Sequence, residues 1–265
     1  MLDAHGHVRR PTRWLVLAGL LALVAGCSRD AAPGAGEPAS RPAAAPDAPS
    51  MRAAGAPADP GLEPRIDGGL APDDAPLVVF LGDSLTAGFG LGEEQAFPAL
   101  VGEELARRGT PVRVINGGIS GDTTAGGLER LDWLLAQGPD VVLVELGAND
   151  GLRGQPLETI EANLRAILER SRATGAQVVL AGMKIPPNYG REYASGFEKI
   201  FPRLAREQDV ALIPFLLDGV AARPELNLPD GIHPNAEGQK IVARSVADAL
   251  EPVLDAVSRE ARPAA

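Results

Sequence analysis

The sequence predicts an α/β fold, specifically a three-layer α/β/α sandwich around a five-stranded parallel sheet. From residue 76 onward, short apolar runs rich in β-branched residues alternate with amphipathic stretches of helical length. A glycine follows three of the expected helices, at Gly109, Gly138 and Gly175, where a left-handed residue is favoured. Right-handed crossovers between parallel strands would bring all the strand ends to one edge, where active residues gather.

Each expected element follows from this alternation. The expected strands span residues 77–81, 112–115, 141–146, 178–181 and 211–213. The expected helices span residues 97–108, 125–135, 157–174, 194–207 and 236–253. The loops that follow the strands are therefore the places in which a functional site is expected.

Residues 1–26 are typical of a lipoprotein signal peptide. Three arginines precede an apolar run at 14–24, which as a helix spans roughly 16 Å, about half of a ~30 Å hydrocarbon core. Small residues then lead to the chain's single cysteine, Cys27, in a pattern that resembles a bacterial lipobox. We expect lipidation of Cys27, and the alternative is ordinary cleavage with an incidental thiol. Lipidation predicts the periplasmic face of a bacterial membrane, with the outer membrane favoured by Ser28 in a Gram-negative cell.

The rest of the chain divides by composition. Residues 27–75 are dominated by Ala, Pro, Gly and Asp, so we expect a disordered tether that begins at the lipidated Cys27. Residues 76–257 form the expected single domain, and 258–265 a flexible tail. The net charge of −10 would repel phosphate backbones, so nucleic-acid partners are not expected. We expect a monomer that meets a membrane through its anchor.

The first strand runs into Gly-Asp-Ser-Leu-Thr-Ala-Gly at 82–88, in which Ser84 is a candidate nucleophile. A turn of small residues after a strand exposes the hydroxyl and lets the serine's own N–H face a developing oxyanion. The alternative is that Ser84 is a helix N-cap, a position that also favours serine. The run lacks the pattern of a phosphate-binding loop.

His233 is the candidate general base, because His5 and His7 lie in the leader. Asp230 precedes it by three residues, a spacing that lets the carboxylate reach one ring nitrogen while the other faces a hydroxyl. The alternative is an exposed loop histidine, with Asp230 as N-cap of the last helix. One histidine and scattered carboxylates are not a zinc ligand set, so no metal is expected.

Two further loops are candidates for binding an oxyanion. Asn149 follows the third strand, and one such amide donor typically contributes about 2.7–4 kcal/mol to transition-state stabilisation. The glycine-rich run 116–123, which includes Gly121, follows the second strand and lets a backbone N–H approach a ligand. Each run alone could be a turn. Four candidate elements at one sheet edge favour a catalytic site.

Together these runs resemble the SGNH, or GDSL-type, hydrolases, which place Ser, Gly, Asn and His in four sequence blocks. The matching blocks lie at 82–85, 120–122, 147–150 and 230–234, and the resemblance covers residues 77–253. Within the family, the segments 145–154 and 187–191 are most similar to the bacterial periplasmic acyl-CoA thioesterase, arylesterase and lysophospholipase group. The resemblance implies a flavodoxin-like sandwich and no cofactor. The lipobox and tether depart from the plain cleavable leader of that group.

The resemblance also implies roles for individual residues. Ser84 would be the nucleophile, His233 the base and Asp230 its orienting carboxylate. The oxyanion donors would be the backbone N–H groups of Ser84 and Gly121 and the side chain of Asn149. Substrate contacts would come from Asp83, Asp150, Leu152, Ile185 and Tyr189, with a mobile flap at 151–154.

The expected reaction is the hydrolysis of a carboxylic ester, a thioester or a lysophospholipid through an acyl-Ser84 intermediate. A carbohydrate O-deacetylase of envelope glycans is the alternative within enzymes, because the same residues cleave acetyl esters. A non-catalytic lipid-binding lipoprotein is the alternative from another class.

Overall fold

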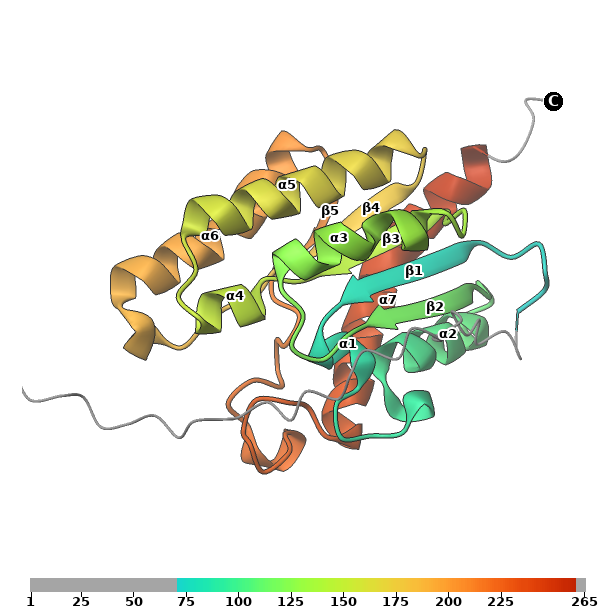
Figure 1. Ribbon diagram of the computed structural model, residues 1–265. Coiled ribbons are helices and arrows are strands. Elements are labelled where there is room, and N and C mark those ends of the chain that lie inside the picture. The colour runs from blue at the N-terminus through green and yellow to red at the C-terminus, as the bar shows by residue number, and fades with distance from the viewer. Residues whose placement is uncertain (1–70, 261–265) are drawn as a thin grey trace, which may run out of the picture. The chain divides into compact units, whose positions relative to one another are not determined.

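The computed structural model describes residues 71–260, and within this range strands and helices alternate as expected (Figure 1). The strands are β1 (Leu77–Gly82), β2 (Arg113–Gly118), β3 (Val141–Glu145), β4 (Gln177–Ala181) and β5 (Ala211–Ile213). The α-helices are α1 (Ser84–Ala87), α2 (Phe97–Arg107), α3 (Thr124–Leu135), α4 (Ala148–Leu152), α5 (Leu157–Ala173), α6 (Arg191–Glu207) and α7 (Ala236–Glu260). Three short 3₁₀ helices lie between them: η1 (Glu93–Gln95), η2 (Pro187–Tyr189) and η3 (Pro224–Leu226).

The strands form one parallel sheet in the order β2-β1-β3-β4-β5. Helices α3, α5 and α6 cover one face of it, and α2 and α7 pack together on the other (Figure 1). The predicted three-layer α/β/α sandwich with a five-stranded parallel sheet is therefore confirmed. The strand order reverses direction between β1 and β3, which is where such sheets bind ligands.

The core lies on both faces of this sheet. All residues of β1 and β3 are buried, as expected for parallel strands covered by helices on each side. Phe80 of β1 packs edge-on against Phe97 of α2, with ring centroids 5.7 Å apart. Gly109, Gly138 and Gly175 have positive φ just past helix ends, as predicted. The strand that leads into Ser84 is thus held in the most buried part of the domain.

Some boundaries differ from the prediction. Strand β2 extends three residues beyond its expected end because Asn116, Gly117 and Gly118 pair in register with the last residues of β1. Helix α7 continues through Pro252 to Glu260, seven residues past its expected end and into the segment predicted as a tail. Pro252 is exposed and Leu254 is fully buried, so packing against the core continues beyond the proline.

The predicted signal peptide, Cys27 and the predicted tether up to residue 70 lie outside the described residues, as do the last five residues of the predicted tail. Residues 71–75 form a turn in which the N–H of Ala75 donates to Pro72 O (3.0 Å), and Ala75 is buried. Among the residues that are described, no helix has the length and apolar character that a membrane crossing requires.

Candidate active site

Ser84 is the first residue of α1, directly beyond the carboxyl end of β1. Asp83 caps this short helix, because its Oδ1 accepts from Leu85 N (3.0 Å). Gly88, in the left-handed conformation, ends it after four residues. The alternative role of Ser84 as an N-cap is therefore wrong, and its half-buried hydroxyl remains available for other contacts.

The Ser84 hydroxyl contacts His233, which comes from the loop before α7. The distance from Ser84 Oγ to His233 Nε2 is 2.9 Å, and His233 Nδ1 lies 2.7 Å from Asp230 Oδ2. Asp230 Oδ1 also accepts from the backbone N–H groups of Ile232 (2.9 Å) and His233 (3.0 Å). The structure thus brings the three predicted residues into one hydrogen-bonded chain with the order Ser–His–Asp.

The electrostatics of Asp230 favour its ionised form. Partial burial acts to raise the pKa of Asp230, but the two backbone donors and the His233 ring outweigh it, so the pKa lies below its usual value. Asp230 does not cap α7, since Asn235 does so by accepting from Glu237 N (3.0 Å) and Gly238 N (3.1 Å). The carboxylate is therefore free to orient the imidazole.

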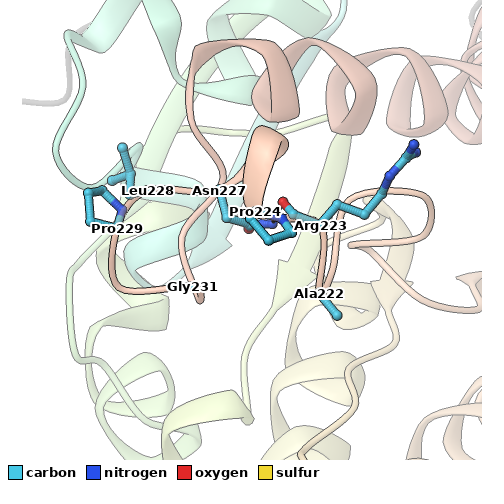
Figure 2. A pocket seen from close by; sticks show the side chains of 7 residues that line it. All are labelled: Ala222, Arg223, Pro224, Asn227, Leu228, Pro229 and Gly231. Carbon is cyan, nitrogen blue, oxygen red and sulfur yellow. Dashed lines mark hydrogen bonds between the residues drawn. The ribbon is translucent and has the colours of Figure 1, made fainter.

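The loop that carries Asp230 and His233 is held by its own hydrogen bonds. Asn227 and Pro234 form an antiparallel bridge, and the N–H of Leu228 donates to His233 O (2.7 Å). A cavity of about 440 Å³ lies at this hairpin (Figure 2) and is lined by Ala222, Arg223, Pro224, Asn227, Leu228, Pro229 and Gly231. In Figure 2 the Arg223 side chain extends away from Leu228 and Pro229. The cavity belongs to the same loop as the candidate base.

Asn149 lies in the first turn of α4, directly after β3. Its Nδ2 donates to Asp83 Oδ2 (2.9 Å), which fixes the orientation of the amide. An amide nitrogen carries two hydrogens, so this bond uses one of them and leaves the second for an acceptor in the site. Asn149 is thereby joined through Asp83 to the loop of Ser84.

Gly121 is exposed in the turn between β2 and α3, with a φ of +82°. In the same turn, Ile119 N donates to Gly82 O (3.1 Å), so the turn lies beside the start of the Ser84 loop. Arg153 Nη2 donates to Gly121 O (3.0 Å) from the end of α4. The Gly121 carbonyl therefore accepts a hydrogen bond from a residue at the end of α4.

Two of the predicted substrate-contacting residues are placed differently. Asp83 and Asp150 are 1% and 3% exposed, and their carboxylates bond to protein groups. Asp150 accepts from the N–H (2.9 Å) and hydroxyl (2.7 Å) of Thr124, which joins α4 to the start of α3. Because neither carboxylate is accessible to a ligand, the prediction that these residues contact substrate is corrected: both support the site from behind.

The other three predicted contacts lie near α4 and the loop after β4. Leu152 is half-buried at the end of α4, and Ile185 is buried against Gly151, whose added Cβ would lie 2.8 Å from Ile185 Cγ2. Tyr189, in η2, is 41% exposed. The segment predicted as a flap begins as the last turn of α4.

Three residues of the site were not predicted from the sequence. The Phe89 ring lies over the His233 ring, with centroids 4.4 Å apart and planes tilted by 34°. Arg130 of α3 donates to Asp122 Oδ2 (2.7 Å), Gly117 O (2.6 Å) and Gly82 O (2.8 Å), which ties the ends of β1 and β2 together. The third residue is Glu145, whose carboxyl group is buried beside the Ser84 turn.

Glu145 is the last residue of β3 and is 0% exposed. Its Oε2 accepts from Asp83 N (3.2 Å) and Thr86 Oγ1 (2.8 Å). Burial, and then the charge of Asp83, raise the pKa of Glu145 well above its usual range. Burial also raises the pKa of Asp83, which its hydrogen bonds offset only in part. The signal in the sequence was a lone charged residue at the end of an apolar strand.

Among residues 71–260, no three His, Cys, Asp or Glu side chains are grouped so that they could hold a metal ion. A family profile described as GDSL-like lipase/acylhydrolase matches residues 80–241.

Curated relatives cover the same part of the chain. An arylesterase of Vibrio mimicus is 47% identical over 174 residues, which are 65% of this chain and 87% of that protein. The thioesterase 1/protease 1/lysophospholipase L1 of Escherichia coli K12 is 44% identical over 183 residues, 68% of this chain and 86% of that protein.

Solved structures agree with this result. The crystal structure of TesA is 41% identical, covers 67% of this chain and 99% of its own, and superposes with a TM-score of 0.65. The psychrotrophic esterase EstA from Pseudoalteromonas sp., inhibited by monoethylphosphonate, is 36% identical with a TM-score of 0.65, over 68% of this chain and 98% of its own.

Proposed function

The chain belongs to the GDSL-like lipase/acylhydrolase family, and from that premise we propose a serine hydrolase that cleaves carboxylic esters or thioesters through an acyl-Ser84 intermediate. The observation that carries the proposal is the hydrogen-bonded chain from Ser84 Oγ through His233 to Asp230. A nucleophile, a base within reach of its proton and a carboxylate that orients the base are the parts that acyl transfer requires.

In the first half-reaction, Ser84 Oγ bonds to the carbonyl carbon while its proton passes to His233 Nε2. The carbonyl oxygen becomes an oxyanion, which accepts from the N–H groups of Ser84 and Gly121 and from the Asn149 amide. Collapse of this intermediate breaks the bond to the alcohol or thiol, and the His233 imidazolium returns its proton to the leaving atom. Asp230 stabilises the imidazolium and holds its Nδ1–H.

In the second half-reaction, water takes the place of the serine hydroxyl. His233 removes a proton from the water, which adds to the acyl carbon, and the second tetrahedral intermediate expels Ser84 Oγ as it regains a proton from His233. The products are the carboxylic acid and free enzyme. No cofactor enters either step.

The decisive experiment replaces the nucleophile. We expect Ser84→Ala to fold normally, to lose turnover of a p-nitrophenyl acyl ester and to escape labelling by a fluorophosphonate. Ser195→Ala is the matched control, because Ser195 is exposed on α6 and takes no part in the site. Retained turnover or retained labelling of Ser84→Ala would exclude the proposed nucleophile.

We propose an acyl chain, rather than an acetylated sugar, as the group recognised beside Ser84. Four large apolar side chains in the segments that follow the strands are 41–51% exposed: Phe89, Ile119, Tyr189 and Ile232. Such side chains favour contact with a lipophilic substrate over a glycan. Comparing acetyl, octanoyl and lysophospholipid substrates tests this, because a preference for acetyl esters would instead favour a carbohydrate O-deacetylase.

We also propose that the enzyme is a monomeric lipoprotein of the bacterial envelope, anchored through Cys27. The support is the sequence alone: an apolar leader, small residues and then a single cysteine. Cys27→Ser should release the protein from membranes into the soluble fraction, with its esterase activity per molecule unchanged. Equal membrane association of both forms would refute the anchor, and light scattering of the domain in solution would test the monomer.

A further inference from the structure

Two buried acidic residues from different elements meet beside Ser84. Glu145 ends β3 and Asp83 precedes α1, and the two residues are 0% and 1% exposed. The two residues are in direct contact, because Glu145 Oε2 accepts from the backbone N–H of Asp83 (3.2 Å). Two ionised carboxylates in contact without water would repel strongly, so such a pair is stable when it shares one proton.

The hydrogen bonds favour Glu145 as the partner that holds that proton. Asp83 Oδ1 accepts from Leu85 N (3.0 Å) and Oδ2 accepts from Asn149 Nδ2 (2.9 Å), so both of its oxygens are arranged for an anion. Glu145 accepts two hydrogen bonds at Oε2, whereas its buried Oε1 has no hydrogen-bond partner among the described residues. A proton on Oε1 would remove the charge that this buried oxygen otherwise carries without a partner.

We propose that Glu145 is a positioning residue for the hydrolase reaction, which acts as a neutral carboxylic acid that holds Asp83 and, through Asp83, the oxyanion-binding amide of Asn149. The proposal rests on the proposed function of Ser84 and Asn149. Glu145 touches no substrate, because it lies behind the loop of Ser84. Its effect passes along two bonds, from Glu145 to Asp83 and from Asp83 to Asn149.

The same arrangement reaches Ser84 by a second route. Oε2 of Glu145 accepts from Asp83 N and from Thr86 Oγ1, which are the neighbours of Ser84 in the turn. The charged groups outside the pair are His233, which acts on Asp83 from the loop before α7, and Arg130, which binds Gly82 O. Ionising Glu145 would place a second negative charge against Asp83 and loosen the anchor of Asn149.

Two substitutions separate this role from mere packing. Glu145→Gln keeps an oxygen for Asp83 N and Thr86 and presents an amide N–H to Asp83, so we expect kcat within about threefold of wild type. Glu145→Leu fills a similar volume without polar atoms, and we expect kcat to fall roughly 10- to 100-fold. This loss is smaller than the ~10²–10³-fold loss of kcat that removal of an oxyanion donor causes. KM should change little in both, because substrate binding does not involve Glu145.

The matched control is Val141→Ala, at the opposite end of the same strand. It removes buried volume from β3 and should lower stability while leaving kcat unchanged. A loss in Glu145→Gln as large as in Glu145→Leu would overturn the proposal, because the charge rather than the neutral acid would then be needed. Full kcat in Glu145→Leu would overturn it as well.

A measurement without turnover keeps this test independent of the proposed function. In ¹³C-detected NMR of glutamate-labelled protein, the resonance that disappears in Glu145→Gln should remain in its protonated position at pH 7. If that carboxyl instead titrates near its ordinary pKa, the neutral acid is refuted even in a fully active hydrolase. If the Glu145 carboxyl stays protonated but Ser84→Ala retains activity, the proposed function is refuted, whereas the neutral state of Glu145 is supported.

Discussion

Replacing Gly118 with alanine should disable the site without touching any reacting group. Gly118 ends β2, and a Cβ added there would lie 2.2 Å from Ala87 N, 2.7 Å from Thr86 C and 2.8 Å from Ala87 Cα. Ordinary contact begins at 3.4 Å, so the backbone of α1 must retreat by about 1.2 Å. Because these atoms are backbone, no side-chain rotation can relieve the contact.

The expected cost follows from that displacement. Helix α1 begins with Ser84, and an error of ~1 Å in a reacting group costs about 10² in rate. Overpacking of this kind typically lowers stability by about 1–3 kcal/mol. We therefore expect Gly118→Ala to remain folded, with kcat for a p-nitrophenyl ester lowered roughly 100-fold.

The assay needs a control that adds the same methyl group elsewhere. Gly102 lies within α2, where a new Cβ would meet only Val114 Cγ2, at 3.2 Å. Gly102→Ala should retain full kcat and gain up to ~1 kcal/mol of stability from the better helix former. The reasoning would be refuted if folded Gly118→Ala had a kcat within about threefold of wild type. Such a ratio corresponds to a change of under about 1 kcal/mol in the activation free energy.

Three further predictions concern the polar groups. Asn149→Ala should lower kcat by about 10²–10³ with little change in KM, because it removes one oxyanion donor. Asp230→Asn should lower kcat by roughly 10⁴ at neutral pH, because the amide no longer holds the required tautomer of His233. The pKa of Glu145 lies above its unfolded value, so its contribution to stability is complete below the unfolded pKa and is lost as pH rises toward the folded pKa. Between those values we expect the free energy of unfolding to fall by about 1.4 kcal/mol per pH unit, and Glu145→Gln should abolish this slope.

Each of these has a clear contrary result. A rise in KM without a fall in kcat for Asn149→Ala would place the amide in ground-state binding. Full activity of Asp230→Asn would show that backbone contacts alone orient His233. The free energy of unfolding can be measured in urea from pH 5 to 8 for wild type and Glu145→Gln. If it depends on pH in the same way in both proteins, Glu145 titrates normally.

The sheet was predictable because its strands are apolar and are separated by helices of clear period. The short helices were not: α1 and α4 have four and five residues, contain turn-forming residues, and exist because Asp83 and Gly147 begin them at the sheet edge. The extension of α7 beyond Pro252 depends on packing of Leu254, which no local pattern reveals. Local propensity thus located the elements, whereas tertiary contacts set their ends.

The candidate site was predictable where counting sufficed. His233 is the single histidine after the leader, which left one choice of imidazole and identified Asp230 beside it. The depth of Asp83 and Asp150 could not be read from the sequence, because an acidic residue in a turn is usually exposed. Phe89 and Arg130 act across gaps of many residues, so their contacts with His233 and Gly82 appear only in three dimensions.

The hydrogen bond between Ser84 and His233 spans 149 positions of sequence, most of the length of the domain. The nucleophile is made early in synthesis, whereas its base follows the fifth and last strand. A chain that is still being synthesised or exported therefore has no working pair, and it gains one when the loop before α7 closes over a finished sheet. Hydrolytic activity consequently reports that folding is complete. The rate at which activity returns after dilution from denaturant therefore measures the slowest step of folding.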